Sequence, residues 1–308
     1  MNQPMPETGL VGFICPRTNE KVLFEACFAC VDHCHPLPLI IALMKRRPVV
    51  PNRYSVTEIL NPPRIIDFSR RYPYFAKLES LVWGTFGTAW HNVVERSKAK
   101  IIELGLGDDY KIETFMEAPI STPAGDITLT GIADLYHVPP KHLWDFKTMK
   151  NFAIQKIRSS KSWDGQTYHW QVNLYRRHGF PETEMMLMEC IIKDWSEAVQ
   201  EKYHLKPVET LEIPFIRDEV LDEYVKAKVA YILECEKDPS LIRDCTEEET
   251  WFNRNPKSKN FNQHLRCKSY CVISELCPQY QKWLLENKHV TREKSRSTKR
   301  SKTSKQAL

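Results

Sequence analysis

The sequence predicts an α/β protein in which helices flank a mixed central sheet. Three strand-like runs, at 111–120, 127–138 and 143–148, follow one another with short connections, which is typical of an antiparallel meander that begins a sheet. Residues 84–104 and 162–178 carry apolar side chains at helical spacing on either side of these strands. With 308 residues and a hydrophobic fraction of 42%, the chain can fill the core of one large domain or two ordinary ones.

The remaining elements are predicted from the same local signals. Ser55 and Glu58 have the spacing of a capping box, so a helix is expected to begin there. The other expected elements are an apolar helix at 36–50 that ends in Lys45, Arg46 and Arg47, late strands at 185–195 and 208–216, and an amphipathic helix at 219–237.

Composition divides the chain into four parts. They are a cysteine-rich module at 1–50, a core at 51–240, a second cysteine-containing segment at 241–287 and a basic tail at 288–308. The tail holds eight Lys or Arg and one acid, so it carries more than the whole net charge of +5 and leaves residues 1–287 close to −2. The tail is expected to be disordered, and it either adds non-specific affinity for phosphate or only promotes solubility. A nucleic-acid footprint on the rest of the chain must therefore be a local groove.

Two acids and a lysine are the strongest candidates for a reaction site. Asp134 lies in the second strand, and Asp145 and Lys147 lie in the third. Side chains two apart in a strand share a face, so Asp145 and Lys147 are expected to point the same way, with Trp144 and Phe146 on the other face. Carboxylates bind hard divalent cations, and a lysine can neutralise a phosphate or orient water. Taken alone, such a pair is more often a solvated ion pair, and Lys150 is an alternative lysine.

Further candidate residues come before and after these two acids and the lysine in the sequence. His91 precedes it on a predicted helix, and Gln171 and Tyr175 follow it, four apart on another helix. The ordered set His91, Gly131-x-x-Asp134, Asp145-x-Lys147 and Gln171-x-x-x-Tyr175 resembles the PD-(D/E)XK nuclease superfamily, and more narrowly its RecB-like exonuclease branch, which includes AddB, CRISPR-adaptation and phage exonucleases. The resemblance covers roughly residues 54 to 195.

The resemblance implies a restriction-endonuclease-like fold and a metal-dependent reaction on DNA. It assigns Mg2+ or Mn2+ to His91, Asp134, Asp145 and the backbone carbonyl of Phe146, and it gives Lys147 the role of positioning the attacking water. Gln171 and Tyr175 would touch DNA or brace the metal-binding acids, although a tyrosine at this spacing is more often a core residue. The family also places an acid near the first strand, where the sequence leaves Glu113 and Glu117 open.

The N-terminal cysteines form one candidate metal site. Cys27 and Cys30 are a tight Cys-x-x-Cys pair, and Cys15 and Cys34 complete four thiol ligands. Such a set suits a tetrahedral Zn2+ that holds together a segment too small for its own core. The alternative is a group of buried or redundant thiols.

The C-terminal cysteines form a second candidate. Cys245, Cys267, Cys271 and Cys277 have the spacing Cys-x21-Cys-x3-Cys-x5-Cys. The resemblance implies a 4Fe–4S staple here, but relatives take its first ligand from a position that is Asn61 in this chain, which cannot be a thiolate ligand. Cys245 or an N-terminal cysteine would then be the fourth ligand, and four thiolates suit Zn2+ equally well. His264 is a further candidate that would favour Zn2+.

The function that these features favour is a metal-dependent DNA exonuclease acting on single strands or duplex ends. The resemblance implies a role in recombination, replication or repair, with a protein partner from one of these processes, and a phage setting suits a nuclease without a helicase. A non-catalytic nucleic-acid-binding or assembly module and a metal-free scaffold are the alternatives. No membrane partner is expected, because the chain contains no run of eighteen apolar residues. Without a visible secretory signal, a cytoplasmic location is expected, where thiols stay reduced. The residues leave the oligomeric state open.

Overall fold

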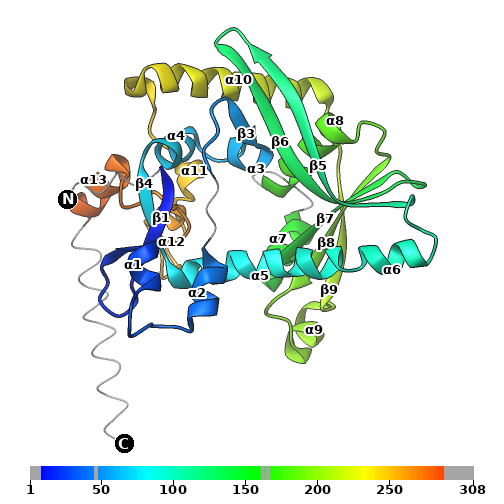
Figure 1. Cartoon of the computed structure of the whole chain (residues 1–308), viewed down its shortest axis with the longest axis horizontal. Coiled ribbons are helices and arrows are strands. Elements are labelled where there is room, and N and C mark those ends of the chain that lie inside the picture. Colours follow the sequence, from blue (N-terminus) through cyan, green and yellow to red (C-terminus); the bar gives the residue numbers. More distant parts are fainter. Residues whose placement is uncertain (1–7, 45–47, 161–162, 164–166, 288–308) are drawn as a thin grey trace, which may run out of the picture.

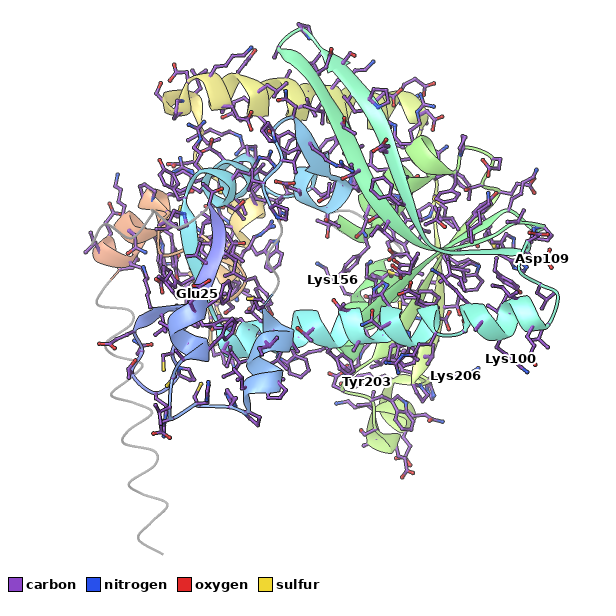
Figure 2. The ribbon with its side chains drawn as sticks, in the orientation of Figure 1. Glu25, Lys100, Asp109, Lys156, Tyr203 and Lys206 are labelled. Carbon is purple, nitrogen blue, oxygen red and sulfur yellow. The ribbon has the colours of Figure 1, made fainter. Side chains whose placement is uncertain are left out.

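The computed structural model describes residues 8–44, 48–160, 163 and 167–287, and within these it shows two sheets with helices around them (Figure 1). The predicted tail at 288–308 and the basic end of the first predicted helix, Lys45 to Arg47, lie outside the described residues. Figure 2 places Glu25, in the N-terminal part, and Lys100 at opposite ends of the molecule.

The larger sheet is mixed, as the sequence predicts. Its path runs through β3 (Arg53–Ser55), β6 (Gly125–His137), β7 (His142–Met149), β8 (Met185–Ile192) and β9 (Val208–Ile213), with β5 (Tyr110–Thr122) paired to β6. The strands β5, β6 and β7 form the predicted antiparallel meander. The pairs β7–β8 and β3–β6 are parallel, and β8–β9 is antiparallel. The α/β class with a mixed central sheet is therefore confirmed, and it is consistent with a restriction-endonuclease-like fold.

Helices pack on both faces of this sheet. On one face lie α3 (Val56–Ile59), α8 (Thr167–Gly179) and α10 (Asp218–Lys237), whose apolar residues join the main core. The predicted capping box begins α3, because Glu58 N donates to Ser55 Oγ at 3.2 Å and Ser55 N donates back to the Glu58 carboxylate at 3.4 Å. The helix α5 (Leu78–Glu95) contacts β5 and β7 from the side opposite α10 (Figure 1).

The single helix predicted over 84–104 is wrong in one respect. The segment contains two helices, α5 and α6 (Lys98–Glu103), with a break between them. At the break, the Ser97 hydroxyl donates to the Val94 carbonyl at 2.6 Å. A serine that bonds a preceding backbone carbonyl competes with the helical ladder, which accounts for the interruption.

The smaller sheet lies at the N-terminal end of the molecule. It has the order β2 (Lys21–Leu23), β1 (Gly9–Ile14) and β4 (Pro73–Lys77), and α1 (Phe24–Phe28) and α2 (Leu37–Leu43) complete its separate apolar core. Since β4 pairs in parallel with β1, the boundary predicted at residue 50 falls between two strands of one sheet.

The C-terminal segment has little regular structure and packs against α4 (Pro63–Arg71). Ile65 of α4 forms a small core with Ile273 and Cys277. The other helices are α7 (Asn151–Ser160), α9 (Glu197–Tyr203), the short 3-10 turn η1 (Pro239–Leu241), α11 (Glu247–Thr250), α12 (Leu265–Ser269) and α13 (Pro278–Glu286). Among the described residues, no helix combines the length and apolar character that a membrane crossing requires.

Candidate active site

The candidate site begins where two neighbouring strands separate. The pairing of β6 with β7 runs from His137↔His142 to Leu135↔Trp144 and stops there, so Asp134 and Asp145 face each other at the point of divergence. The Asp134 carboxylate accepts a hydrogen bond from the backbone N–H of Phe146 at 2.7 Å. A side chain thus replaces the next rung of the ladder and fixes the Asp134 carboxylate between the strands.

Asp145 and Lys147 form a buried pair on one face of β7, as alternation predicts. Lys147 Nζ lies 2.8 Å from both carboxylate oxygens of Asp145. Asp145 is only 1% exposed. Lys147 donates its hydrogen bond to Oδ1, and Oδ2 is a buried oxygen without a hydrogen-bond donor. The ion pair with Lys147 offsets the burial of this oxygen, which accepts no hydrogen bond and so remains available to a metal cation.

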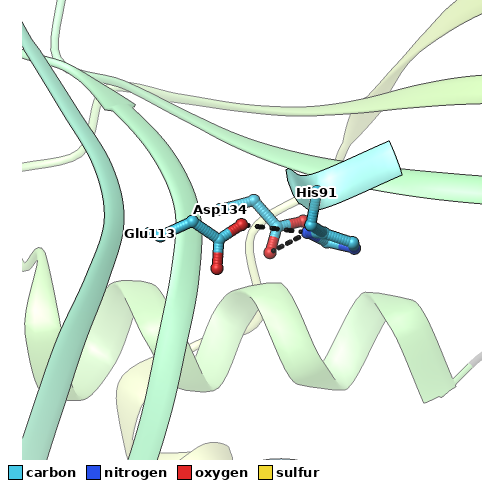
Figure 3. A group of neighbouring side chains, drawn as sticks. All are labelled: His91, Glu113 and Asp134. Atoms are coloured by element: carbon cyan, nitrogen blue, oxygen red, sulfur yellow. Dashed lines mark hydrogen bonds and ion pairs between the residues drawn. The ribbon is translucent and has the colours of Figure 1, made fainter. Parts of the chain in front are cut away.

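His91, Glu113 and Asp134 converge (Figure 3). Asp134 and His91 lie near enough to Asp145 for their charges to act on its carboxyl group. His91 Nδ1 lies 3.1 Å from Glu113 Oε1 and 3.4 Å from Asp134 Oδ1. Among the described residues, this is the one group of His, Cys, Asp or Glu that brings three ligand atoms within 4.8 Å of one another. One nitrogen and several oxygens are donors that suit Mg2+ or Mn2+.

The structure separates the two acids that the sequence left open. Glu113 lies between the register pairs Ile112↔Leu135 and Thr114↔Ala133, at the level of Asp134, and has a φ of +47°. This is a left-handed backbone conformation that glutamate rarely adopts, and such strain is common at functional sites. Glu117 lies farther along β5 and approaches Arg53 at 3.6 Å. Glu113, and not Glu117, is therefore the acid that joins His91.

The charges of this group influence one another strongly. Hydrogen bonding to Asp134 and then to Glu113 raises the pKa of His91 to about 10, although burial opposes the charge. Burial raises the pKa of the Asp145 carboxyl above its ordinary range, while Lys147 opposes this shift. Burial also disfavours the charged form of Lys147, but the Asp145 carboxylate outweighs it, and the lysine pKa is raised. A carboxylate-rich pocket that holds protons this firmly is also suited to a cation.

Gln171 and Tyr175 lie on α8 beneath the strands. Gln171 donates to the Tyr175 hydroxyl at 3.0 Å, and Tyr175 is 5% exposed. A Cβ on Gly131 would approach the Tyr175 ring to 2.6 Å, so this glycine lets the helix lie close to β6. Burial raises the pKa of Tyr175 to about 12, and Asp145 adds to this shift. Tyr175 is thus a core residue that supports the strands near the acids, and DNA contact by either residue stays a prediction.

The site opens into a cleft of about 830 Å³. His91, Glu113, Asp134 and Tyr175 line one part of it, and Arg53, Arg70, Phe115, Thr130 and Ile132 are among the residues that line the rest. The cleft is large enough for several nucleotide-sized groups, and it joins the acids to basic and apolar side chains.

The four N-terminal thiols lie near one another. Among the described residues, however, no three of their sulfur atoms lie within 4.8 Å of one another. Burial, then Cys34, Cys15 and Cys30, raise the pKa of Cys27. Cys15 differs, because the backbone N–H groups of Thr18 and Arg17 donate to its sulfur and lower its pKa. The Arg17 guanidinium also donates to the Asp32 carbonyl at 2.6 Å, which ties the turn after Cys15 to the loop that holds Cys30 and Cys34. Zinc at this group stays a prediction.

The four C-terminal thiols also influence one another. Burial raises the pKa of Cys245 and of Cys267 to about 12, and other thiols of the group add to both shifts. Arg266 donates to the Asn61 side chain at 2.7 Å, so Asn61 lies beside the helix that carries Cys267. His264 instead pairs with Thr250 Oγ1 at 2.8 Å. The identity of any bound metal stays a prediction.

Comparison with known proteins gives distant structural similarity. No protein-family model and no curated protein matches the chain. The crystal structure of SSO0001 is similar over 79% of this chain and 94% of that one, with 13% identity and a TM-score of 0.45. A phage-related exonuclease from Haemophilus somnus 129PT is similar over 50% of this chain and 73% of that one, with 16% identity and a TM-score of 0.28. A phage-related exonuclease is thus a distant structural neighbour.

Proposed function

We propose that the chain is a divalent-cation-dependent nuclease that hydrolyses phosphodiester bonds in DNA. The observation that carries this proposal is the convergence of His91, Glu113 and Asp134, within 4.8 Å, beside the buried Asp145–Lys147 pair. Three acids close together in a partly buried site repel one another, and His91 and Lys147 offset only part of their charge, which leaves a net negative site that favours a divalent cation.

The residues fit Mg2+ or Mn2+. His91, Glu113 and Asp134 would hold the ion, and Asp145 Oδ2, which accepts no hydrogen bond, would add a ligand from β7. When bound, such an ion polarises the scissile phosphate and lowers the pKa of a coordinated water. The Phe146 N–H keeps Asp134 oriented through its 2.7 Å hydrogen bond.

Lys147 has a different task from the acids. Its ammonium is held by Asp145 and lies 5.7 Å from the centre of the Tyr168 ring, so its position is fixed from two sides. From there it can orient the attacking water and offset negative charge that develops on the phosphoryl oxygens. A fixed charge in a buried site stabilises such a transition state more than a mobile surface lysine would.

The decisive experiment is incubation of the purified chain with end-labelled single-stranded and double-stranded DNA in Mg2+, Mn2+ or EDTA. We expect cleavage that requires the cation, with mononucleotides or short products released from an end if the exonuclease assignment is correct. The Asp145→Asn variant should lose activity by about a thousandfold or more, since it removes charge that the cation and Lys147 both need.

The matched control is Asp126→Asn, which removes an exposed carboxylate from the same strand as Asp134. It should keep full activity and stability. Equal cleavage by Asp145→Asn and the wild type would reject the role given to Asp145. Cation-independent binding of DNA by the wild type without cleavage would reject the nuclease and favour a binding module.

A further inference from the structure

An exposed apolar pair lies next to the acidic group on the same face of the β5–β6 hairpin. In the register, Phe115 faces Ile132, and each lies two residues along its strand from one of the acids, Glu113 on β5 and Asp134 on β6. Phe115 is 53% exposed and Ile132 is 48% exposed, although both lie in the middle of long strands. On the opposite face of β5, Met116 is buried against the core.

The surroundings of this pair are those of a nucleic-acid groove. Both residues line the 830 Å³ cleft that contains the acids. A step of two residues along a strand is about 7 Å, so the pair lies about one nucleotide from the candidate cation site. The Arg53 guanidinium lies over one face of the Phe115 ring, 5.6 Å from its centre, and approaches Glu117 at 3.6 Å, so a positive charge accompanies the ring and the other face is the one left for a base. Aromatic faces interleaved with positive charge are the usual means of holding a single strand.

We propose that Phe115, supported by Ile132, is the stacking platform for an unpaired base of the DNA strand whose phosphate enters the acidic site. This inference rests on the proposed function and adds to it the strand state of the substrate. A paired base in a duplex is covered on both faces by its neighbours, whereas an unpaired base exposes a face that an aromatic ring can cover. The platform therefore selects single-stranded DNA, or a frayed end, over intact duplex.

The test compares normal and abasic substrates. Single-stranded oligonucleotides carry one abasic site, moved stepwise from the labelled end, and kcat/KM is measured for wild type and Phe115→Ala. For the wild type, one abasic position should reduce kcat/KM by about tenfold, as expected for the loss of one stacked base. Phe115→Ala should lose the same factor on the normal strand and nothing further on that abasic strand, while Phe115→Trp should restore the preference.

The control is Phe261→Ala, which removes an exposed phenylalanine, 43% accessible, that does not line the cleft. It should leave both substrates unchanged. Equal losses on normal and abasic strands in Phe115→Ala, or no loss on either, would overturn the platform.

A binding measurement separates this failure from failure of the proposed function. Fluorescence anisotropy of labelled single strands in EDTA reads binding without cleavage. If the wild type cleaves no DNA, the nuclease is rejected, but a base-dependent loss of affinity in Phe115→Ala would still support the platform. If cleavage is normal and Phe115→Ala binds every strand as the wild type does, the platform alone is rejected.

Discussion

The acidic site and the C-terminal cysteine group are both sets of candidate metal ligands, but the chain holds them in different ways. The acids come from neighbouring strands of one sheet, β5, β6 and β7, and the ligand atoms of Glu113 and Asp134 converge with that of His91. The cysteines lie on connections and short helices. Cys245 precedes α11, Cys267 lies in the five-residue α12, and Cys277 precedes α13.

This difference teaches which site needs its metal for folding. Around the cysteines, the local core has only three buried residues, Ile65, Ile273 and Cys277. Burial raises the pKa of Cys245, Cys267 and Cys271, while Arg64 opposes the shift at Cys245 and Arg266 opposes it at Cys267. We therefore expect the acids to bind a cation for chemistry, and the cysteines to bind a metal or cluster that completes the fold.

The largest effect that would test this contrast is the loss of one cysteine ligand. Cys277→Ala should lower the free energy of unfolding by about 3 kcal/mol and reduce the bound iron or zinc, because the remaining thiols cannot close the group. The measurements are denaturant unfolding and metal analysis of the purified protein. Activity per folded molecule should change little at low temperature, unlike that of Asp145→Asn.

Cys235→Ala is the matched control for this loss. Cys235 is also buried, at 1% exposure, but lies on α10 outside both cysteine groups. Its replacement should cost about 1 kcal/mol through lost packing and leave the metal content unchanged. If Cys277→Ala keeps its metal and costs no more than Cys235→Ala, the cysteine group has no metal role in folding.

The acidic site could be predicted from the sequence in more detail than the cysteine group. The meander and the Asp145–Lys147 pair follow from alternation, which is a local property of strands, and so the structure agrees with the prediction. The cysteine spacing gives no comparable rule, because loops do not impose a distance between residues twenty or more positions apart. The sequence therefore predicts a cysteine group but does not predict the distances between its thiols, and metal binding by this group stays a prediction.

Glu113 shows what local patterns missed at the acidic site itself. Alternation treats Glu113 and Glu117 alike, since both lie on one face of β5. The choice depends on the left-handed φ at Glu113 and on the approach of His91 from α5, both of which are tertiary features. The same holds for Phe115, where a hydrophobic residue at a strand position reads as core until the face is seen to be exposed.

The second largest expected effect is the release of a proton from His91 when a cation binds to the acidic site. The pKa of His91 is raised to about 10 by Asp134 and Glu113, so without a cation the ring is protonated at pH 7. A metal ligand must be a neutral imidazole, so cation binding must expel this proton. The affinity for Mn2+ should therefore rise with pH, by up to tenfold per unit between about pH 6.5 and 8.5.

Calorimetry in two buffers of different ionisation enthalpy measures this proton directly. Close to one proton should leave per cation bound, and His91→Asn should release fewer and show a shallower dependence on pH. The charged ring also stabilises the cation-free fold, fully below about pH 6.5 and progressively less as pH rises towards 10. Binding without proton release would mean that His91 is not a ligand.

The smallest effect concerns Lys228, where α10 meets the cysteine segment. Burial lowers the pKa of Lys228 to about 8, while Glu249 opposes this shift. The unfolded chain therefore binds more protons than the folded chain between about pH 8 and 10.5, so stability should rise with pH across that window. Lys228→Met should remove this slope and raise the free energy of unfolding at pH 7 by about 1 kcal/mol.

Lys226→Met, an exposed neighbour on the same helix, should keep the slope and the stability of the wild type. The response of Lys228 also reports on the cysteines, because Cys245 is among the groups whose negative charge raises its pKa. Thiolates held by a metal would move the slope to higher pH and reduce the gain from Lys228→Met, whereas protonated thiols would leave both as described. The control is removal of bound metal by a chelator. If the slope of unfolding free energy against pH is the same before and after removal, no thiolate charge forms beside α10. The metal is then not bound by Cys245.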